Sequence, residues 1–221
     1  MGAGNTKSTT GRGYRSPLRE AQARQTRARI MAAAARRFLA HGYSGTTMRA
    51  IALDADVALP TVELAFRTKA RLLKAVIDVA TAGDDEHVAM LERQWATQAQ
   101  SIAEAPGFIA AFARVLTTSA ERAAGLTAAA LEGARTDEDI AAVAAQLMTQ
   151  RQVMAAWLVD GIMLRAPLRD ETSRADAADT VWTLMDPVIF RRLTEDRHWS
   201  PSQFERWFTD SVTRLLLPTA R

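Results

Sequence analysis

The residues from Thr46 to Phe66 read TTMRAIALDADVALPTVELAF, and this stretch decides the fold. Two short segments with apolar residues at helical spacing, 47–53 and 59–66, flank a turn at 54–57, which is the spacing of a helix-turn-helix. The small Ala52 stands where the two helices would cross closely. Asp56 stands at the turn position that needs a left-handed backbone, which Asp tolerates less well than Gly but better than most residues. The side chains spaced to lock the pair of helices in place are Met48, Ile51, Val57, Val62 and Phe66.

The neighbouring segments also follow helical patterns. A helix is expected from about 20 to 40, because Ile30, Ala34 and Phe38 recur at four-residue spacing and Gly42 can end it. Thr47 is expected to cap the first motif helix, and Thr68 to cap a longer helix from 69 to about 81. These segments predict a compact three-helix unit followed by a connecting helix.

The rest of the chain predicts long amphipathic helices and shows no alternation typical of strands. We expect an all-α protein with an N-terminal three-helix helix-turn-helix DNA-binding domain and a larger helical ligand-binding and dimerisation domain. The expected boundaries are a disordered basic arm at 1–19, the DNA-binding domain at 20–83 with its motif at 47–66, and the larger domain at 84–221. Helices in this larger domain are expected at about 84–101, 106–122, 127–133, 136–164, 173–185, 187–195 and 200–217.

Charge is distributed unevenly along the chain. Residues 1–74 hold 14 Lys and Arg against 4 acids, whereas residues 75–221 hold 14 against 21. A basic N-terminal part on an acidic body indicates that only the first part meets a polyanion. Five arginines in the basic arm and at the start of the first helix are expected to lie along the minor groove or to contact flanking phosphates. The alternative is a solvated terminus without contacts. These arginines are Arg12, Arg15, Arg19, Arg24 and Arg27.

The run from Thr26 to Asp78 resembles the DNA-binding domain of the tetracycline-repressor (TetR) family over about a quarter of the chain. The residues that carry the resemblance are Phe38, His41-Gly42-Tyr43, Thr46-Thr47-Met48-Arg49, Ile51-Ala52, Val57, Phe66-Arg67-Thr68-Lys69 and Leu72-Leu73. The resemblance implies a dimeric transcriptional regulator, more often a repressor, that a small-molecule effector releases from a palindromic operator on double-stranded DNA.

The resemblance also implies a DNA-binding face. Thr47 would contact phosphate, Arg49 would reach backbone or a groove edge, and Lys69 would bind phosphate. The remaining candidates lie on or just after the recognition helix: Pro60, Thr61, Glu63, Leu64 and Arg67. The family usually has Ser at the position of Ala58, Gly at those of Asp56 and Pro60, Tyr at that of Glu63, and a polar or basic residue at that of Leu64.

Glu63 has two possible roles that the sequence leaves open. A carboxylate facing phosphates is repelled unless it accepts a hydrogen bond from a cytosine amino group. Alternatively, Glu63 points aside and pairs with Arg67, four residues further along the helix.

The larger domain carries bulky apolar side chains at helical spacing. An apolar or amphipathic effector would need a cavity among them, which we expect near Phe112, Met154 and Trp157. The last two long helices have wide apolar faces that a lone monomer would not easily cover, so we expect a four-helix homodimer interface. Its expected residues are Val181, Trp182, Met185, Phe204, Trp207, Phe208, Val212 and Leu215.

Chemistry at a metal or active site has no sequence support. The chain has no Cys, its three His lie far apart, and no phosphate-binding glycine loop or nucleophile motif is present. We expect no cofactor, no metal, no enzymatic activity, no membrane insertion and a cytoplasmic location. A second interpretation stays open, in which the chain is a helical ligand-binding or scaffold protein whose DNA-binding motif has decayed.

Overall fold

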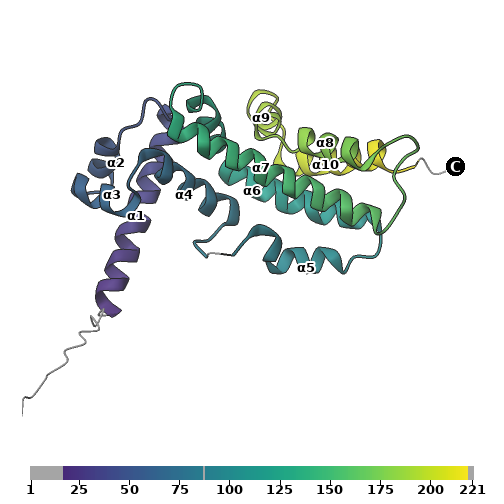
Figure 1. The fold of residues 1–221 in the computed structure, drawn as a ribbon, viewed down its shortest axis with the longest axis horizontal. Coiled ribbons are helices and arrows are strands. Elements are labelled where there is room, and N and C mark those ends of the chain that lie inside the picture. The colour runs from purple at the N-terminus through teal and green to yellow at the C-terminus, as the bar shows by residue number, and fades with distance from the viewer. Residues whose placement is uncertain (1–16, 87, 219–221) are drawn as a thin grey trace, which may run out of the picture.

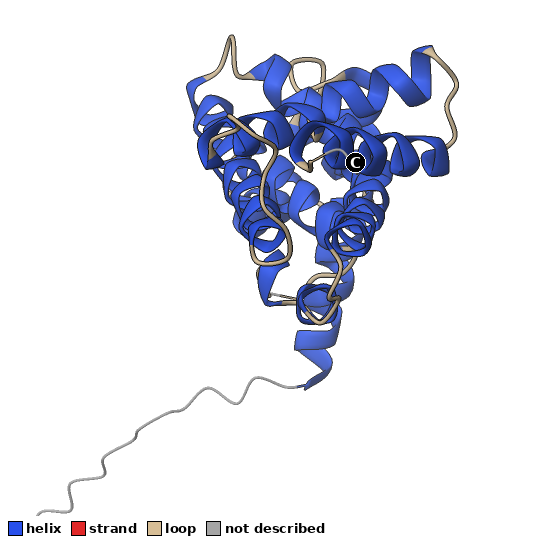
Figure 2. Ribbon diagram, turned by 90° about the vertical axis from the view of Figure 1, so that its right-hand side faces the viewer, coloured by secondary structure: helices blue, strands red, loops and turns tan. Residues whose placement is uncertain are grey.

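A computed structural model describes residues 17–86 and 88–218 of the chain. All the regular elements of these residues are helical, with loops and turns between them (Figure 2). The expectations for Arg12 and Arg15 fall outside the described residues. None of the described helices is both long enough and apolar enough to span a membrane.

Four helices form the N-terminal part, called the head here: α1 (Pro17–His41), α2 (Met48–Asp54), α3 (Leu59–Phe66) and α4 (Lys69–Ala82). The predicted end signals are confirmed. Thr47 and Thr68 accept hydrogen bonds as N-caps of α2 and α4, while Gly42 has a φ of 65° after α1. Asp56 has a φ of 50° in the turn between α2 and α3, as its position predicted.

Six α-helices form the body, with a 3₁₀ turn, η1 (Met90–Glu92), before them and a π turn, η2 (Arg192–Asp196), after α9. The two longest of them lie side by side and extend away from the head (Figure 1). Helices α8 and α10 pack on these two. The body helices are α5 (Gln94–Gln100), α6 (Ala105–Gly133), α7 (Glu138–Met163), α8 (Arg174–Leu184), α9 (Pro187–Arg191) and α10 (Pro201–Leu216).

Two helix predictions in the body are wrong. The expected break between 122 and 127 is absent, because the small residues there continue the buried face of α6 without interruption. The expected helix over 84–101 forms only from Gln94 onward. The side chain of Asp84, expected near that helix start, instead accepts two hydrogen bonds from Arg93 and holds the segment as a loop.

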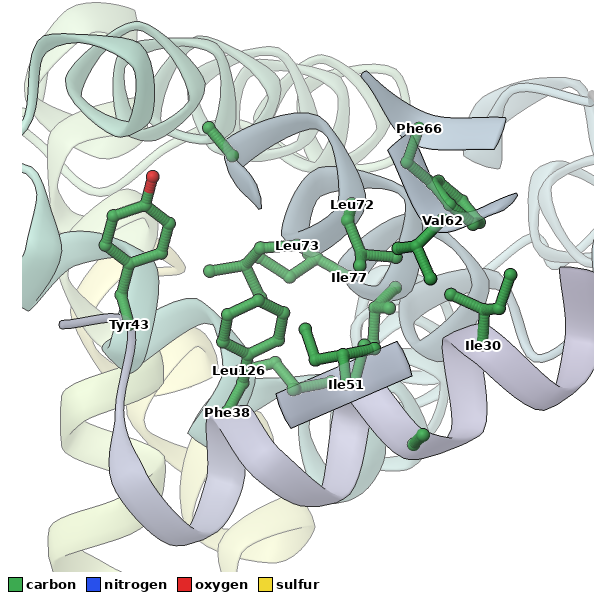
Figure 3. Close-up of a cluster of buried hydrophobic side chains, with 14 of the residues drawn as sticks. Ile30, Phe38, Tyr43, Ile51, Val62, Phe66, Leu72, Leu73, Ile77 and Leu126 are labelled. Carbon is green, nitrogen blue, oxygen red and sulfur yellow. The ribbon is translucent and has the colours of Figure 1, made fainter. Parts of the chain in front are cut away.

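The buried residues form two clusters. The first lies in the head, where Phe38, Ile51, Val62 and Leu73 meet (Figure 3), and residues of α6 and α7 such as Leu126 complete it. The second lies among α6, α7, α8 and α10. The head therefore shares its apolar core with the near ends of the two long body helices, and head and body are joined by more than α4 alone.

Candidate nucleic-acid interface

The helix-turn-helix is held against α1 by two arginines. Arg37 Nε and Nη2 donate to the two carboxylate oxygens of Asp54 at 2.6 and 2.8 Å, and this pairing lowers the pKa of Asp54. Arg29 donates to the backbone oxygens of Ala55 and Asp56 in the turn. These bonds satisfy carbonyls that the left-handed turn leaves outside the helices, and so they fix the angle between α2 and α3.

The second motif helix has one side buried and one side open. Val62 and Phe66 point into the head core, as predicted (Figure 3). Pro60, Glu63 and Leu64 lie on the opposite side, and Leu64 is 87% exposed. Thr61 is half-buried at the edge. An amphipathic helix this short, with its outer side uncovered, has the form of a recognition helix that enters the major groove.

Polar groups flank this open side. Arg49 is exposed on α2, and the Thr47 hydroxyl accepts from the Ala50 N–H at 3.1 Å, so the start of α2 is ordered. The first turn of α2 offers backbone N–H groups of the kind that bind phosphate. Arg67, directly after α3, is exposed and adopts a φ of 65°.

Lys69 is placed differently from what its family role implies. Its Nζ donates to the backbone oxygens of Tyr43 and Thr46 at 2.9 and 3.0 Å and lies 4.0 Å from the centre of the Tyr43 ring. Burial lowers the pKa of Lys69, and the nearby Asp137 carboxylate opposes that shift. The ammonium has three N–H donors, and two of them hold the turn between α1 and α2, so at most one remains for another partner.

Tyr43 links the head to the body, a role that sequence reasoning did not identify. Its side chain is 4% exposed, and its hydroxyl donates to Asp137 Oδ2 at 3.0 Å. Burial, followed by the Asp137 carboxylate, raises the pKa of Tyr43. Asp137 is also the N-cap of α7, and Gly133 at the end of α6 leaves room for the ring. Helical periodicity gives no signal for such a contact, because it joins residues 94 positions apart.

The proposed pairing of Glu63 with Arg67 does not form among the ion pairs of the described residues. Elsewhere in the chain the same four-residue spacing does give a pair, between Arg191 and Glu195. At Arg67 the backbone has already left the helix, so the side chain no longer lies above that of Glu63. The Glu63 carboxylate is left on the open side of α3.

The first turns of α1 add positive charge beside the motif. The guanidinium of Arg27 lies 4.3 Å from the centre of the Phe66 ring at the end of α3, which fixes α1 next to that end. The helix continues past the motif towards its N-terminus (Figure 1), and Arg19 and Arg24 are exposed on that part.

Residues 30–76 match the family described as bacterial regulatory proteins, tetR family. Residues 30–76 therefore form a DNA-binding domain of this family. The chain is a DNA-binding transcriptional regulator, and the match covers residues 30–41 of α1, all of α2 and α3, and α4 up to residue 76. No curated protein matches the sequence.

Solved structures share the fold over nearly the whole regulator. NalD, the secondary repressor of the MexAB-OprM multidrug efflux pump in Pseudomonas aeruginosa, aligns with a TM-score of 0.66 and 16% identity over 89% of this chain and 98% of that one. A regulator from Saccharomonospora viridis in complex with choline gives 0.64, with 14% identity over 87% and 98%. FadR from Bacillus subtilis in complex with stearoyl-CoA gives 0.64, with 14% identity over 84% and 96%.

The three expected effector residues of the regulator lie in one cluster of the body. Phe112 is buried and stacks with Trp157 at 6.2 Å between ring centres, and Met154 packs against the same cluster. The ring centres of Phe108 and Trp95 lie 5.2 and 5.4 Å from that of Trp157.

An open pocket of about 570 Å³ lies beside this cluster. It is bordered by the end of α4, by residues within 88–95 together with Glu86, and by α6. Trp95 belongs both to its lining and to the aromatic cluster. The arginines in its lining are Arg93, Arg114 and Arg122. The three expected effector residues are not among those that line this pocket, which lies at the edge of their cluster.

The expected dimer residues divide into two groups. Val181, Met185, Phe204, Phe208 and Val212 are buried within the single chain, because α6 and α7 cover the apolar faces of α8 and α10. The premise that a lone monomer would leave these faces open is therefore wrong for them. Half-buried or exposed side chains remain at Trp182, Trp207 and Leu215.

Potential metal ligands are scattered in the structure. Within residues 17–86 and 88–218, no three His, Asp or Glu side chains gather as they would around a metal ion.

Proposed function

We propose that this tetR-family regulator is a homodimeric repressor, acting in the cytoplasm, that leaves its operator when a small apolar or amphipathic effector binds in the body. The observation that carries the proposal is the open outer side of α3, made of Pro60, Glu63 and Leu64, on a motif that Arg29 and Arg37 hold rigid. A preorganised helix with an uncovered side fits the major groove of a duplex.

Phosphate contacts would fix the head on the duplex. Thr47 and Arg49 at the start of α2, Arg67 after α3, and the third N–H of Lys69 are the groups proposed for them. Thr61, at the edge of the open side, would contact a base or the sugar-phosphate backbone. Such contacts position the protein without reading sequence.

The exposed arginines of α1 are proposed to hold phosphates that flank the operator. Removing one such arginine–phosphate pair lowers the slope of log K against log salt by about 0.9. In a dimer, Arg24→Gln removes two pairs, so the slope should fall by about 1.8. Arg206→Gln, an exposed change on α10, is the matched control. An unchanged slope would assign Arg24 to solvent.

Dimerisation is proposed through α8 and α10, at the side chains that the single chain leaves open. Leu215 is 47% exposed near the end of α10, and Trp207 lies two turns before it on the same side. A charge at this position would be buried in a dimer and solvated in a monomer. Leu215→Glu should therefore give monomers in light scattering, and a dimer of unchanged stability would reject this interface.

The effector is proposed to bind in the pocket beside Trp95. Arg122 in the pocket lining donates to the backbone oxygens of Ala80 and Thr81 in the last turn of α4, at 2.7 and 3.1 Å. Ser119 donates to Thr81 as well. A ligand that draws Arg122 away would release the end of α4, the helix that leads to the head. The signal of effector binding could then pass through α4 to the DNA-binding motif.

A reporter experiment tests the proposed function as a whole. The DNA upstream of the regulator's own gene is fused to a reporter and supplied with the wild-type chain, Arg49→Gln, or the control Arg206→Gln. The wild type and the control should lower expression, and Arg49→Gln should restore it. Expression that the wild type raises or leaves unchanged would contradict repression at this promoter.

A further inference from the structure

Glu63 is an acid in the middle of a surface that is expected to meet a polyanion. It lies on the open side of α3 and takes part in none of the ion pairs of the described residues. Exposed or half-buried cations lie in or next to the motif instead, among them Arg27, Arg49, Arg67 and Lys69. A carboxylate here lowers the affinity for any duplex by charge repulsion, unless the bound state gives it a donor of its own.

The groove of a duplex offers two kinds of amino donor. The cytosine N4 amino group is the donor that a carboxylate accepts from. The adenine N6 amino group stands beside the N7 acceptor, which suits the paired donor and acceptor of Asn or Gln but repels a carboxylate oxygen. A carboxylate on a recognition helix therefore distinguishes C from A at the position that it faces.

Leu64, the next residue, places an apolar side chain on the same open side of α3. Its side chain is 87% exposed, the highest value among the large apolar side chains of the described residues. An apolar group in the major groove has one apolar partner on the bases, the methyl group of thymine. Glu63 and Leu64 both lie on the open side of α3, about 100° apart around the helix axis, so both side chains can reach base edges in the same stretch of the groove.

We propose that α3 reads a cytosine through the Glu63 carboxylate and a neighbouring thymine through the Leu64 side chain in each half of the operator. This inference rests on the proposed operator binding and adds the bases that are read. Good bidentate contacts discriminate between bases by about 5- to 150-fold, and we expect these single contacts to reach the lower end, about 5-fold.

Selection from a random-sequence duplex library tests the inference with the full-length chain. Three variants accompany the wild type: Glu63→Gln, Leu64→Ala and, as a matched control, Glu121→Gln at an exposed position of α6. All three positions are exposed, so thermal unfolding should stay within about 0.5 kcal/mol of the wild type and show that each variant is folded.

The expected result is a change at defined positions. The wild type and Glu121→Gln should enrich the same half-site with an adjacent C and T. Glu63→Gln should exchange that C for A, because Gln pairs with the N6 and N7 atoms of adenine. Leu64→Ala should lose about 5-fold or more of the preference for T alone.

Two outcomes overturn the inference and are distinguishable. If the wild type enriches a half-site that Glu63→Gln enriches unchanged, Glu63 reads no base, while operator binding stands. If the wild type enriches no sequence at all, operator binding fails and the inference fails with it.

Discussion

Replacing Tyr43 by Phe is expected to weaken the contact between head and body while leaving the packing in place. Phe keeps the ring between Lys69 and the end of α6 and removes only the hydroxyl that donates to Asp137 at 3.0 Å. A hydrogen bond to a charged acceptor contributes about 1.5 to 3 kcal/mol. Because Asp137 is only half-buried, we expect the lower end, about 1.5 kcal/mol.

A double-mutant cycle isolates this contribution from the capping role of Asp137. Asp137→Ser keeps a good N-cap for α7, since Ser ranks with Asp at this position, but its side chain is too short to reach Tyr43. The free energies of unfolding of the wild type, both single variants and the double variant are measured in urea. We expect an interaction energy of about 1 to 2 kcal/mol between the two sites.

The cycle has a clear refuting result. If the effects of the two substitutions add within about 0.3 kcal/mol, the hydroxyl and the carboxylate do not interact in solution, and the head is not tied to the body here. Tyr43→Phe should also shift the midpoint of thermal unfolding down by about 3 to 6 °C for a chain of this size. An unchanged midpoint would contradict the burial of the hydroxyl at this junction.

Two further changes test the body. Gly161→Ala should destabilise by about 1 to 3 kcal/mol in urea unfolding, because the added methyl group would clash with the Phe108 ring, and a neutral result would contradict this packing. Pairing with Arg93 lowers the pKa of Asp84 to about 2 from 3.8. The ion pair therefore stabilises the folded state above about pH 4, and this stabilisation is lost as the pH falls towards 2. The fluorescence of Trp95 should change over the same pH range, and Asp84→Asn should abolish this change. If Asp84→Asn shows the same acid transition, another group causes it.

The sequence predicted the head well because its structure follows from local rules. The caps at Thr47 and Thr68, the left-handed Asp56 and the inward spacing of Val62 and Phe66 each depend on residues within one or two turns. The family resemblance indicated the outward residues of α3, of which Pro60 and Leu64 are exposed. Because these local signals agree with one another, the motif can be predicted from a single sequence.

The sequence failed where distant residues decide the outcome. The inward turn of Lys69 and the bond from Tyr43 to Asp137 join segments that no spacing rule relates. The apolar side chains of α8 and α10 gave the right amphipathic pattern, but a pattern does not say whether the same chain or a second copy covers it. For Phe208 and Val212 the cover is the chain's own α6 and α7.

The most direct test of the central claim is the ratio of two dissociation constants. Fluorescence anisotropy gives the affinity of the full-length protein for a duplex enriched by selection and for a scrambled duplex of the same composition, at a salt concentration of about 150 mM. Reading of base edges by α3 predicts binding at least about 1,000-fold tighter to the selected duplex. Equal affinity for both duplexes would contradict the claim that the open side of α3 reads DNA sequence.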